Sequence, residues 1–218
     1  SHEIRTPLTI VRSSLENLES EPLSDGARTY VARAREGSER LGAIVQAMGA
    51  ATRVEEAIRA AERTRFDLAA LLGSAIQAYR DAFPQRGFRL EGADRPCEML
   101  GAPDLVLQAL DKLVDNAVDF SPPGSIIRLR LRDTDEARLA LEVENDGPPL
   151  PADAGARLFE SLWQHRRDED GKPHFGLGLY IVRLIAEFHA GSVLAEDLPE
   201  PPGGVRFTVS ISRNPPEM

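Results

Sequence analysis

Cysteine is nearly absent from this chain, which holds only Cys97 among 218 residues. One cysteine cannot form an internal disulfide or a cysteine-cluster metal site, as expected of a protein kept in a reducing compartment. We interpret Cys97 as a loop thiol or a small core thiol. No apolar run approaches the roughly 18 residues that a membrane-spanning helix needs, and no signal peptide is present. Because the first residue is Ser and not Met, we expect a soluble piece of a longer protein.

Positive charge is also in deficit. The chain has 26 Lys and Arg against 35 Asp and Glu, a formal net charge of −9, and its pI is near 5.0. This balance argues against a surface that binds a phosphate backbone, so we expect no direct nucleic-acid partner. The hydrophobic content of 42% is enough for a packed core, and the length suits one or two domains.

The first 63 residues have the period of packed helices. Apolar residues recur at steps of four and three along residues 1–19, and a second stripe follows along residues 27–61. Turn residues cluster between them at 21–26. The stripes consist of Ile4, Leu8, Val11, Leu15 and Leu18, then Tyr30, Ala34, Leu41, Ile44, Met48 and Ala51. One hairpin cannot bury such a seam alone, so we expect two copies to form a four-helix bundle as a homodimer.

A second domain is expected from residue 64 to residue 218. Asp67 suits the N-cap of a helix over 68–81, and two more helices are expected over 103–120 and 179–189. Short or alternating segments predict strands near 88–91, 97–100, 126–132, 138–144, 192–195 and 205–211. This order fits one sheet with helices on one face, an α/β sandwich. The predicted fold class is therefore α+β, a helical hairpin followed by a sandwich domain.

The run Ser1–Thr9 (SHEIRTPLT) carries the first chemical signal. On a helix, Glu3 lies beside His2, and Thr6 lies one turn further along the same face. An imidazole, a carboxylate that takes its proton and a hydroxyl that holds water are the parts needed to make a phosphohistidine and to hydrolyse a nearby phosphoryl group. Pro7 would cost roughly 3 kcal/mol in a helix interior. A histidine near a frayed terminus is the plain alternative. The whole run closely resembles the H box of dimeric sensor histidine kinases of the HisKA type.

Four segments of the second domain carry a further resemblance. Residues 111–120 (DKLVDNAVDF) resemble the N box, 143–151 (VENDGPPLP) the first glycine box, 158–160 (LFE) the F box and 176–182 (GLGLYIV) the second glycine box. Each is weak alone, but the four stand in the family's order behind an H box and cover nearly the whole chain. The sequence is therefore similar to the core of a bacterial two-component sensor kinase: a HisKA segment before an ATPase domain of the gyrase, Hsp90, histidine kinase and MutL type.

Side-chain chemistry suits these segments. Gly176 and Gly178 let backbone N–H groups approach phosphate oxygens. Asn116 can offer a carbonyl oxygen to Mg²⁺, which prefers hard oxygen ligands. The polar stretch 161–175 suits a lid over ATP, in which Arg166, Arg167 and Lys172 are either phosphate contacts or solvated charges. His165, His174 and His189 stay unassigned.

The resemblance implies an activity and a set of site residues. ATP bound with Mg²⁺ would phosphorylate His2, and a response-regulator aspartate would then receive the phosphoryl group. Glu3 would act as general base or orienting acceptor, and Thr6 would position water for the reverse reaction. The implied nucleotide contacts are Lys112, Asn116, Asp119, Asn145, Gly147, Gly176, Gly178 and Leu179, with Asn116 and Asp119 as metal ligands. The parent would be anchored in the inner membrane with this portion in the cytoplasm.

Several positions depart from the family pattern. Asn145 stands where an aspartate usually recognises the adenine amino group, and the acid Asp146 is one residue out of register. Pro149 replaces the second glycine of that box, and His174 stands where an extra glycine is often found upstream of the second. Lys112 replaces the first N-box asparagine, and Asp119 replaces the usual basic residue.

Three functions follow from these observations. The first is an ATP-dependent protein-histidine kinase core with reverse phosphatase activity. The second is a dimeric docking or phosphatase module whose ATP site has decayed. The third, a gyrase-like or chaperone-like ATPase, gives no reason for the helical hairpin or for His2.

Overall fold

The computed structural model describes residues 2–151, 155–160, 177–199 and 203–216. The chain forms two compact units, one built mainly from Ser1–Val54 and the other beginning at Glu55. A single long helix crosses from the first unit into the second. The division that the sequence suggests between residues 63 and 64 stays a prediction.

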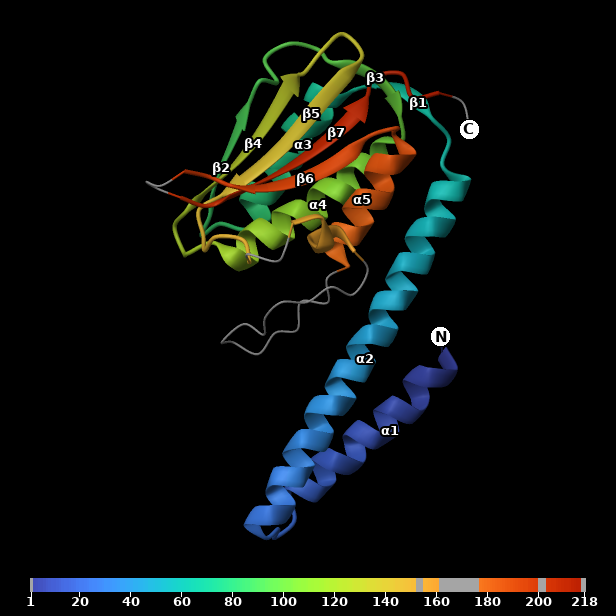
Figure 1. The fold of residues 1–218 in the computed structure, drawn as a ribbon, viewed down its shortest axis with the longest axis vertical. Coiled ribbons are helices and arrows are strands. Elements are labelled where there is room, and N and C mark those ends of the chain that lie inside the picture. The colour runs from blue at the N-terminus through green and yellow to red at the C-terminus, as the bar shows by residue number, and fades with distance from the viewer. Residues whose placement is uncertain (1, 152–154, 161–176, 200–202, 217–218) are drawn as a thin grey trace. The chain divides into compact units, whose positions relative to one another are not determined.

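The first unit is the expected helical hairpin (Figure 1). Helix α1 spans His2–Glu19 and contains Pro7, and helix α2 spans Asp25–Ala60. Ser24 begins α2: its hydroxyl accepts from the amide of Ala27 at 3.3 Å, and its carbonyl accepts from the amide of Arg28 at 2.9 Å. An ion pair of 3.2 Å between Glu19 and Arg35 joins the two helices.

One copy of the hairpin leaves most of its apolar seam uncovered. Leu15 and Val45 are each only 9% exposed. By contrast, seven of the eight exposed large hydrophobic side chains in the described ranges lie on α1 and α2: Ile4, Ile10, Val11, Leu18, Tyr30, Leu41 and Met48. This apolar surface fits a helix pair that packs against further helices.

The second unit is built on a five-stranded sheet in the order β2-β4-β5-β7-β6. The strands are β2 (Gly87–Glu91), β4 (Ile126–Asp133), β5 (Arg138–Asn145), β6 (Ser192–Asp197) and β7 (Val205–Ser212). The β2–β4 pair is parallel and the other pairs are antiparallel.

Three helices cover one face of this sheet (Figure 1): α3 (Leu68–Ala82), α4 (Pro103–Phe120) and α5 (Gly178–Phe188). Alternation along the strands separates the faces. On β4, Ile127, Leu129 and Leu131 are buried in the core, whereas the arginines between them are not. The predicted α+β class, a helical hairpin followed by a sandwich domain, is confirmed.

The expectation of a single sheet was wrong. Residues 64–67, which the sequence indicates only as a boundary, form strand β1 (Thr64–Asp67), and it pairs with β3 (Glu98–Gly101) in a separate two-stranded sheet. A four-residue strand is too short to show a period, and its partner lies far away in the sequence. A short 3₁₀ helix, η1 (Gly155–Phe159), also went unpredicted.

Asp67 is the N-cap of α3, as predicted. Its carboxylate accepts from the amide of Ala69 at 3.0 Å and from the amide of Cys97 at 2.9 Å. These bonds lower the pKa of Asp67, and the bond from Cys97 contributes most. The Asp67 carboxylate thus caps α3 and also binds the backbone of Cys97, the residue before β3. No helix in the described part of the chain is both long and apolar enough to cross a membrane.

Candidate functional site

One face of α4 carries the three polar residues that the N-box resemblance singled out. The opposite face of α4 packs against the core, where Leu113, Val114 and Ala117 are fully buried. Lys112 and Asn116 are half-buried and Asp119 is exposed. Their spacing of four and three residues places them on one stripe of the helix. Across the described ranges, no group of three or more His, Cys, Asp or Glu side chains gathers as a metal site.

The beginning of α5 lies beside Lys112. A Cβ atom placed on Gly178 would stand 3.8 Å from Cδ of Lys112, an ordinary contact distance. The N-cap residue, Leu177, makes no side-chain capping bond. The first N–H groups of an α-helix have no partner within the helix, so the amides of Gly178 and Leu179 are suited to an anion. The tertiary fold thus joins the N box to the second glycine box.

Asn145 ends β5 on the inner face of the sheet and is only 2% exposed. Its Nδ2 donates to the carbonyl oxygen of Asp146 at 3.1 Å, which fixes the orientation of the amide because only the NH₂ side can donate. Its Oδ1 is buried, and no hydrogen-bond partner for it exists among the described residues. A buried acceptor without a partner costs roughly 1–3 kcal/mol, and a ligand that donates to it would remove that cost.

Asp146 lies on the other side of the sheet from this acceptor. Its carboxylate forms an ion pair with Arg128 of β4 at 3.4 Å. Arg128 belongs to the outer face of β4, where it pairs in register with Glu144. Because the carboxylate of Asp146 is paired on the outer face and the amide of Asn145 is buried on the inner face, Asp146 cannot take the place of Asn145.

Two glycines, Gly147 and Gly204, lie beside Asn145 where a side chain would not fit. A Cβ atom on Gly147 would stand 2.5 Å from the carbonyl oxygen of Phe120, at the end of α4. Gly204 has φ of +126°, and a Cβ atom there would stand 2.2 Å from the carbonyl oxygen of Asn145. The motifs in the sequence pointed to Gly147 and not to Gly204, although the Gly203-Gly204 pair directly before β7 was a usable signal. Pro149 is exposed in the loop that follows Gly147.

The remaining candidates divide into two groups. His2 and Glu3 begin α1, and Thr6 has an exposed side chain one turn later. Gly176, the expected lid 161–175 and its Arg166, Arg167 and Lys172 lie outside the described residues, as do His165 and His174.

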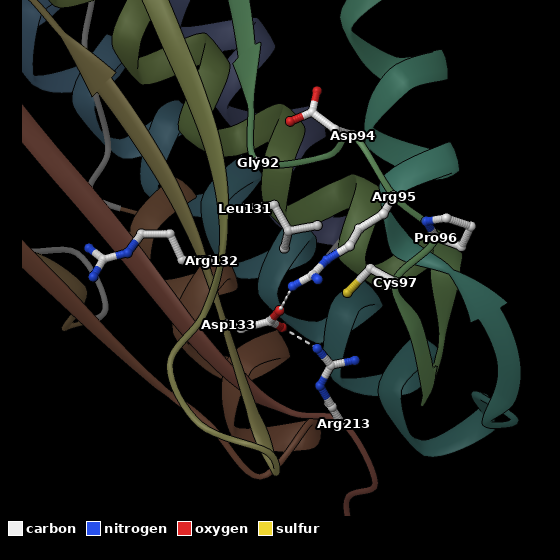
Figure 2. Close-up of a pocket in the computed structure, with 9 residues that line it drawn as sticks. All are labelled: Gly92, Asp94, Arg95, Pro96, Cys97, Leu131, Arg132, Asp133 and Arg213. Carbon is white, nitrogen blue, oxygen red and sulfur yellow. Dashed lines mark hydrogen bonds and ion pairs between the residues drawn. The ribbon is translucent and has the colours of Figure 1, made fainter.

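A hollow of about 680 Å³ occupies a different part of the second unit (Figure 2). Its lining consists of Gly92, Asp94, Arg95, Pro96, Cys97, Leu131, Arg132, Asp133 and Arg213. The Asp133 carboxylate is shared between Arg95, at 3.1 Å, and Arg213. Burial raises the pKa of the Cys97 thiol and keeps it protonated. None of the predicted nucleotide contacts lines this hollow, so we place the candidate site at α4, α5 and the end of β5.

Two protein-family models match the chain. Residues 101–215 match the family of histidine kinase-, DNA gyrase B- and HSP90-like ATPases, and residues 1–57 match the His Kinase A (phospho-acceptor) domain. These ranges contain every residue of the candidate site.

Curated relatives align along nearly the whole chain. The sensor protein ChvG of Rhizobium meliloti (strain 1021) is 28% identical over 99% of this chain and 39% of its own length. The sensor protein CreC of Escherichia coli (strain K12) is 27% identical over 98% of this chain and 44% of its length. The signal transduction histidine-protein kinase BaeS of the same strain is 28% identical over 97% of this chain and 45% of its length. The chain therefore spans less than half the length of these relatives.

Solved structures of similar proteins share the fold. Full-length ShkA in complex with AMPPNP matches with a TM-score of 0.63 and 26% identity, over 96% of this chain and 44% of that chain. Histidine kinase ThkA in complex with the response regulator protein TrrA matches with a TM-score of 0.64 and 21% identity, over 98% and 60%. Together with the motifs and the site geometry, these matches show that the chain belongs to the family of histidine kinase-, DNA gyrase B- and HSP90-like ATPases and carries an N-terminal phospho-acceptor segment of the kind found in sensor histidine kinases.

Proposed function

We propose that this chain is an ATP-dependent protein-histidine kinase core that phosphorylates its own His2 and passes the phosphoryl group to a response-regulator aspartate. One observation carries the nucleotide part of the proposal: the buried Oδ1 of Asn145, an acceptor without a partner among the described residues. It stands where the family recognises the adenine amino group, and it fits that role because it can only accept.

The phosphate end of the nucleotide would lie between α4 and α5. The uncapped amides of Gly178 and Leu179 suit phosphate oxygens, and Lys112 is close enough to α5 to add a positive charge. Asn116, and Asp119 one turn later, are the side chains proposed to hold Mg²⁺, which takes its other ligands from phosphate and water. Bound there, Mg²⁺ would neutralise charge on the transferring group.

His2 would attack with a ring-nitrogen lone pair. The new N–P bond forms as the bond between the γ-phosphorus and the bridging oxygen breaks, and ADP leaves with that electron pair. Glu3 would take the proton from the other ring nitrogen, so that the product is a neutral phosphohistidine ring. In the reverse reaction, Thr6 would hold the water that attacks the phosphorylated regulator.

A homodimer is the assembly that the hairpin supports. The exposed seam, from Ile4 and Val11 on α1 to Leu41 and Met48 on α2, would be covered by the hairpin of a second copy in a four-helix bundle. The solved complex of ThkA with TrrA supports a response regulator as the partner. As the resemblance to sensor kinases implies, we further propose that the parent is anchored in the inner membrane, with this core in the cytoplasm.

One contact favours the alternative function, a docking or phosphatase module with a decayed ATP site. Lys112 is held by Asp115 at 3.2 Å in a half-exposed ion pair, which competes with a phosphate for its charge. An exposed pair of this kind contributes about 0–1 kcal/mol, so a triphosphate can displace it. We therefore favour the kinase.

The deciding experiment is autophosphorylation with γ-labelled ATP and Mg²⁺, with His2→Gln as the matched control. The kinase proposal expects a base-stable, acid-labile phosphoryl group that is absent from the His2→Gln protein, which should still dimerise and bind ATP. Nucleotide binding without any label would favour the docking module. Label that persists in His2→Gln would remove His2 as the acceptor.

A further inference from the structure

Arg63 lies in the three-residue connection between α2 and β1. Its side chain contacts two residues that are far away in the sequence, Phe188 and Pro216. Its Nη2 donates to the carbonyl oxygen of Phe188, and its Nη1 donates to the carbonyl oxygen of Pro216. The guanidinium carbon also lies 4.6 Å from the centre of the Phe188 ring. Nε is buried without a hydrogen-bond partner among the described residues. We call this set of interactions the Arg63 clamp.

The clamp acts on the end of α5, the helix that begins at the second glycine box. Phe188 is the last residue of α5. A cation beside the final carbonyls of a helix is stabilised by the partial negative charge there, and arginine can bridge two carbonyls while stacking on a ring. The clamp therefore fastens the connection to α5, whose other end faces Lys112 and the proposed phosphates.

The residue after Phe188 extends this attachment to α4. His189 is fully buried, and its ring packs edge-on against the Phe188 ring at 4.8 Å. Its Nδ1 donates to the carbonyl oxygen of Ile185 at 2.8 Å, and its Nε2 accepts from the amide of Ala102 at 3.1 Å. Ala102 is the N-cap residue of α4. Both helices that carry the proposed ATP contacts thus meet beside Arg63.

We propose that Arg63 is a positioning residue for phosphoryl transfer: it fixes the connection from α2 onto the end of α5, which His189 in turn joins to the start of α4. This inference rests on the proposed kinase function. Without the clamp, Ala61–Arg63 become additional free tether between the helical segment and the ATP-binding domain. A longer free tether lowers the effective concentration of one reacting group near the other and leaves the binding of ATP itself unchanged.

The test compares Arg63→Met, Arg63→Lys and the matched control Arg65→Met, whose exposed arginine stands two residues further along. Three measurements are made on each protein: the Kd for a fluorescent ATP analogue, the initial rate of His2 phosphorylation at saturating ATP, and the hydrogen exchange of backbone amides 61–64. Arg63→Met should keep its Kd within about twofold, lose about tenfold in rate and exchange faster at 61–64. Arg63→Lys should recover little, because one ammonium group cannot bridge two carbonyls. Arg65→Met should match the parent in all three.

Two results would overturn the assignment. An unchanged phosphorylation rate in Arg63→Met, with faster exchange at 61–64, would show that the clamp exists and does not position the reaction. A loss of ATP affinity in Arg63→Met that matches its loss in phosphorylation rate would show that Arg63 only stabilises the ATP-binding domain. A parent protein that binds nucleotide but forms no phosphohistidine would instead refute the proposed function, and the proposed role of Arg63 in the reaction would fall with it.

Discussion

The side-chain amide of Asn145 donates to the backbone carbonyl of Asp146 across 3.1 Å, and this bond decides which atom of Asn145 faces a ligand. The nitrogen is directed at the carbonyl, and the oxygen is left buried without a partner among the described residues. An asparagine at this position is therefore a neutral acceptor with a fixed direction.

Replacing Asn145 by aspartate should not improve the site, although aspartate is the usual residue of the family. One carboxylate oxygen would face the carbonyl oxygen of Asp146, and the repulsion is relieved only when the carboxyl group is protonated. We expect ATP binding by Asn145→Asp to be weakened about tenfold, or 1.4 kcal/mol, near pH 8 and to recover as the pH falls toward 5. Titration with an ATP analogue across this range, beside the parent protein, gives the answer. Stronger binding by Asn145→Asp at pH 8 would contradict the role of the amide.

A substitution at Gly178 should weaken ATP binding without lowering the thermal stability of the protein. A Cβ atom there would make only an ordinary contact with Lys112 at 3.8 Å, so Gly178→Ala should melt at an unchanged temperature. A methyl group beside the first amides of α5 should still hinder the approach of a phosphate and weaken ATP binding about tenfold, or 1.4 kcal/mol. Calorimetry and a binding titration on the same samples test both halves. If affinity is unchanged, the nucleotide does not lie against the start of α5.

Asp119 is predicted to bond Mg²⁺ directly or through water. Asp119→Asn should therefore weaken Mg²⁺-dependent nucleotide binding on the order of tenfold, about 1.4 kcal/mol, with little change in binding measured with EDTA. Asparagine removes the negative charge and keeps the size of this exposed side chain. An identical Mg²⁺ dependence in the two proteins would leave Asn116 as the proposed ligand from this face of α4.

Thr6 should affect only the reverse reaction. Its hydroxyl is proposed to hold a water, so Thr6→Ala should slow dephosphorylation of the regulator and spare autophosphorylation of His2. Thr6→Ser keeps the hydroxyl and serves as the control that should retain both activities. Equal loss of both activities in Thr6→Ala would indicate a folding role instead.

The stability of the second unit should fall at mildly acidic pH because of His189. Burial, above all, lowers the pKa of this imidazole, and the nearby positive charge of Arg63 lowers it further. The unfolded chain, with a histidine pKa of about 6.5, then binds a proton that the folded chain does not. The contribution of His189 is complete above about pH 6.5 and declines by up to about 1.4 kcal/mol per pH unit as the pH falls toward the folded-state pKa.

His189→Gln isolates this effect, because the glutamine oxygen can still accept from the Ala102 amide. Urea unfolding at pH 7.5 and at pH 5.5 should show a larger loss of unfolding free energy for the parent than for His189→Gln. Equal losses would mean that other groups carry the acid sensitivity.

Local pattern was enough to determine much of this protein. Alternation along 126–132 and 138–144 predicted two long strands of the sheet, Asp67 predicted the start of α3, and the order of the motifs predicted the family and the fold class. These features depend on residues close together in the sequence, where helical and strand periods decide which side chains share a face.

Only the tertiary structure decided the details of the site. The pairing of β1 with β3, the position of Lys112 beside the start of α5 and the clamp between Arg63 and Phe188 each join segments far apart in the chain. No local period encodes such partners. Asn145 and Asp146 are adjacent in the sequence, and yet their roles too could not be predicted from local pattern. The sequence presents two adjacent polar residues as alternatives, but the side of the sheet that the helices cover makes one a buried acceptor and leaves the other paired with Arg128 on the opposite face.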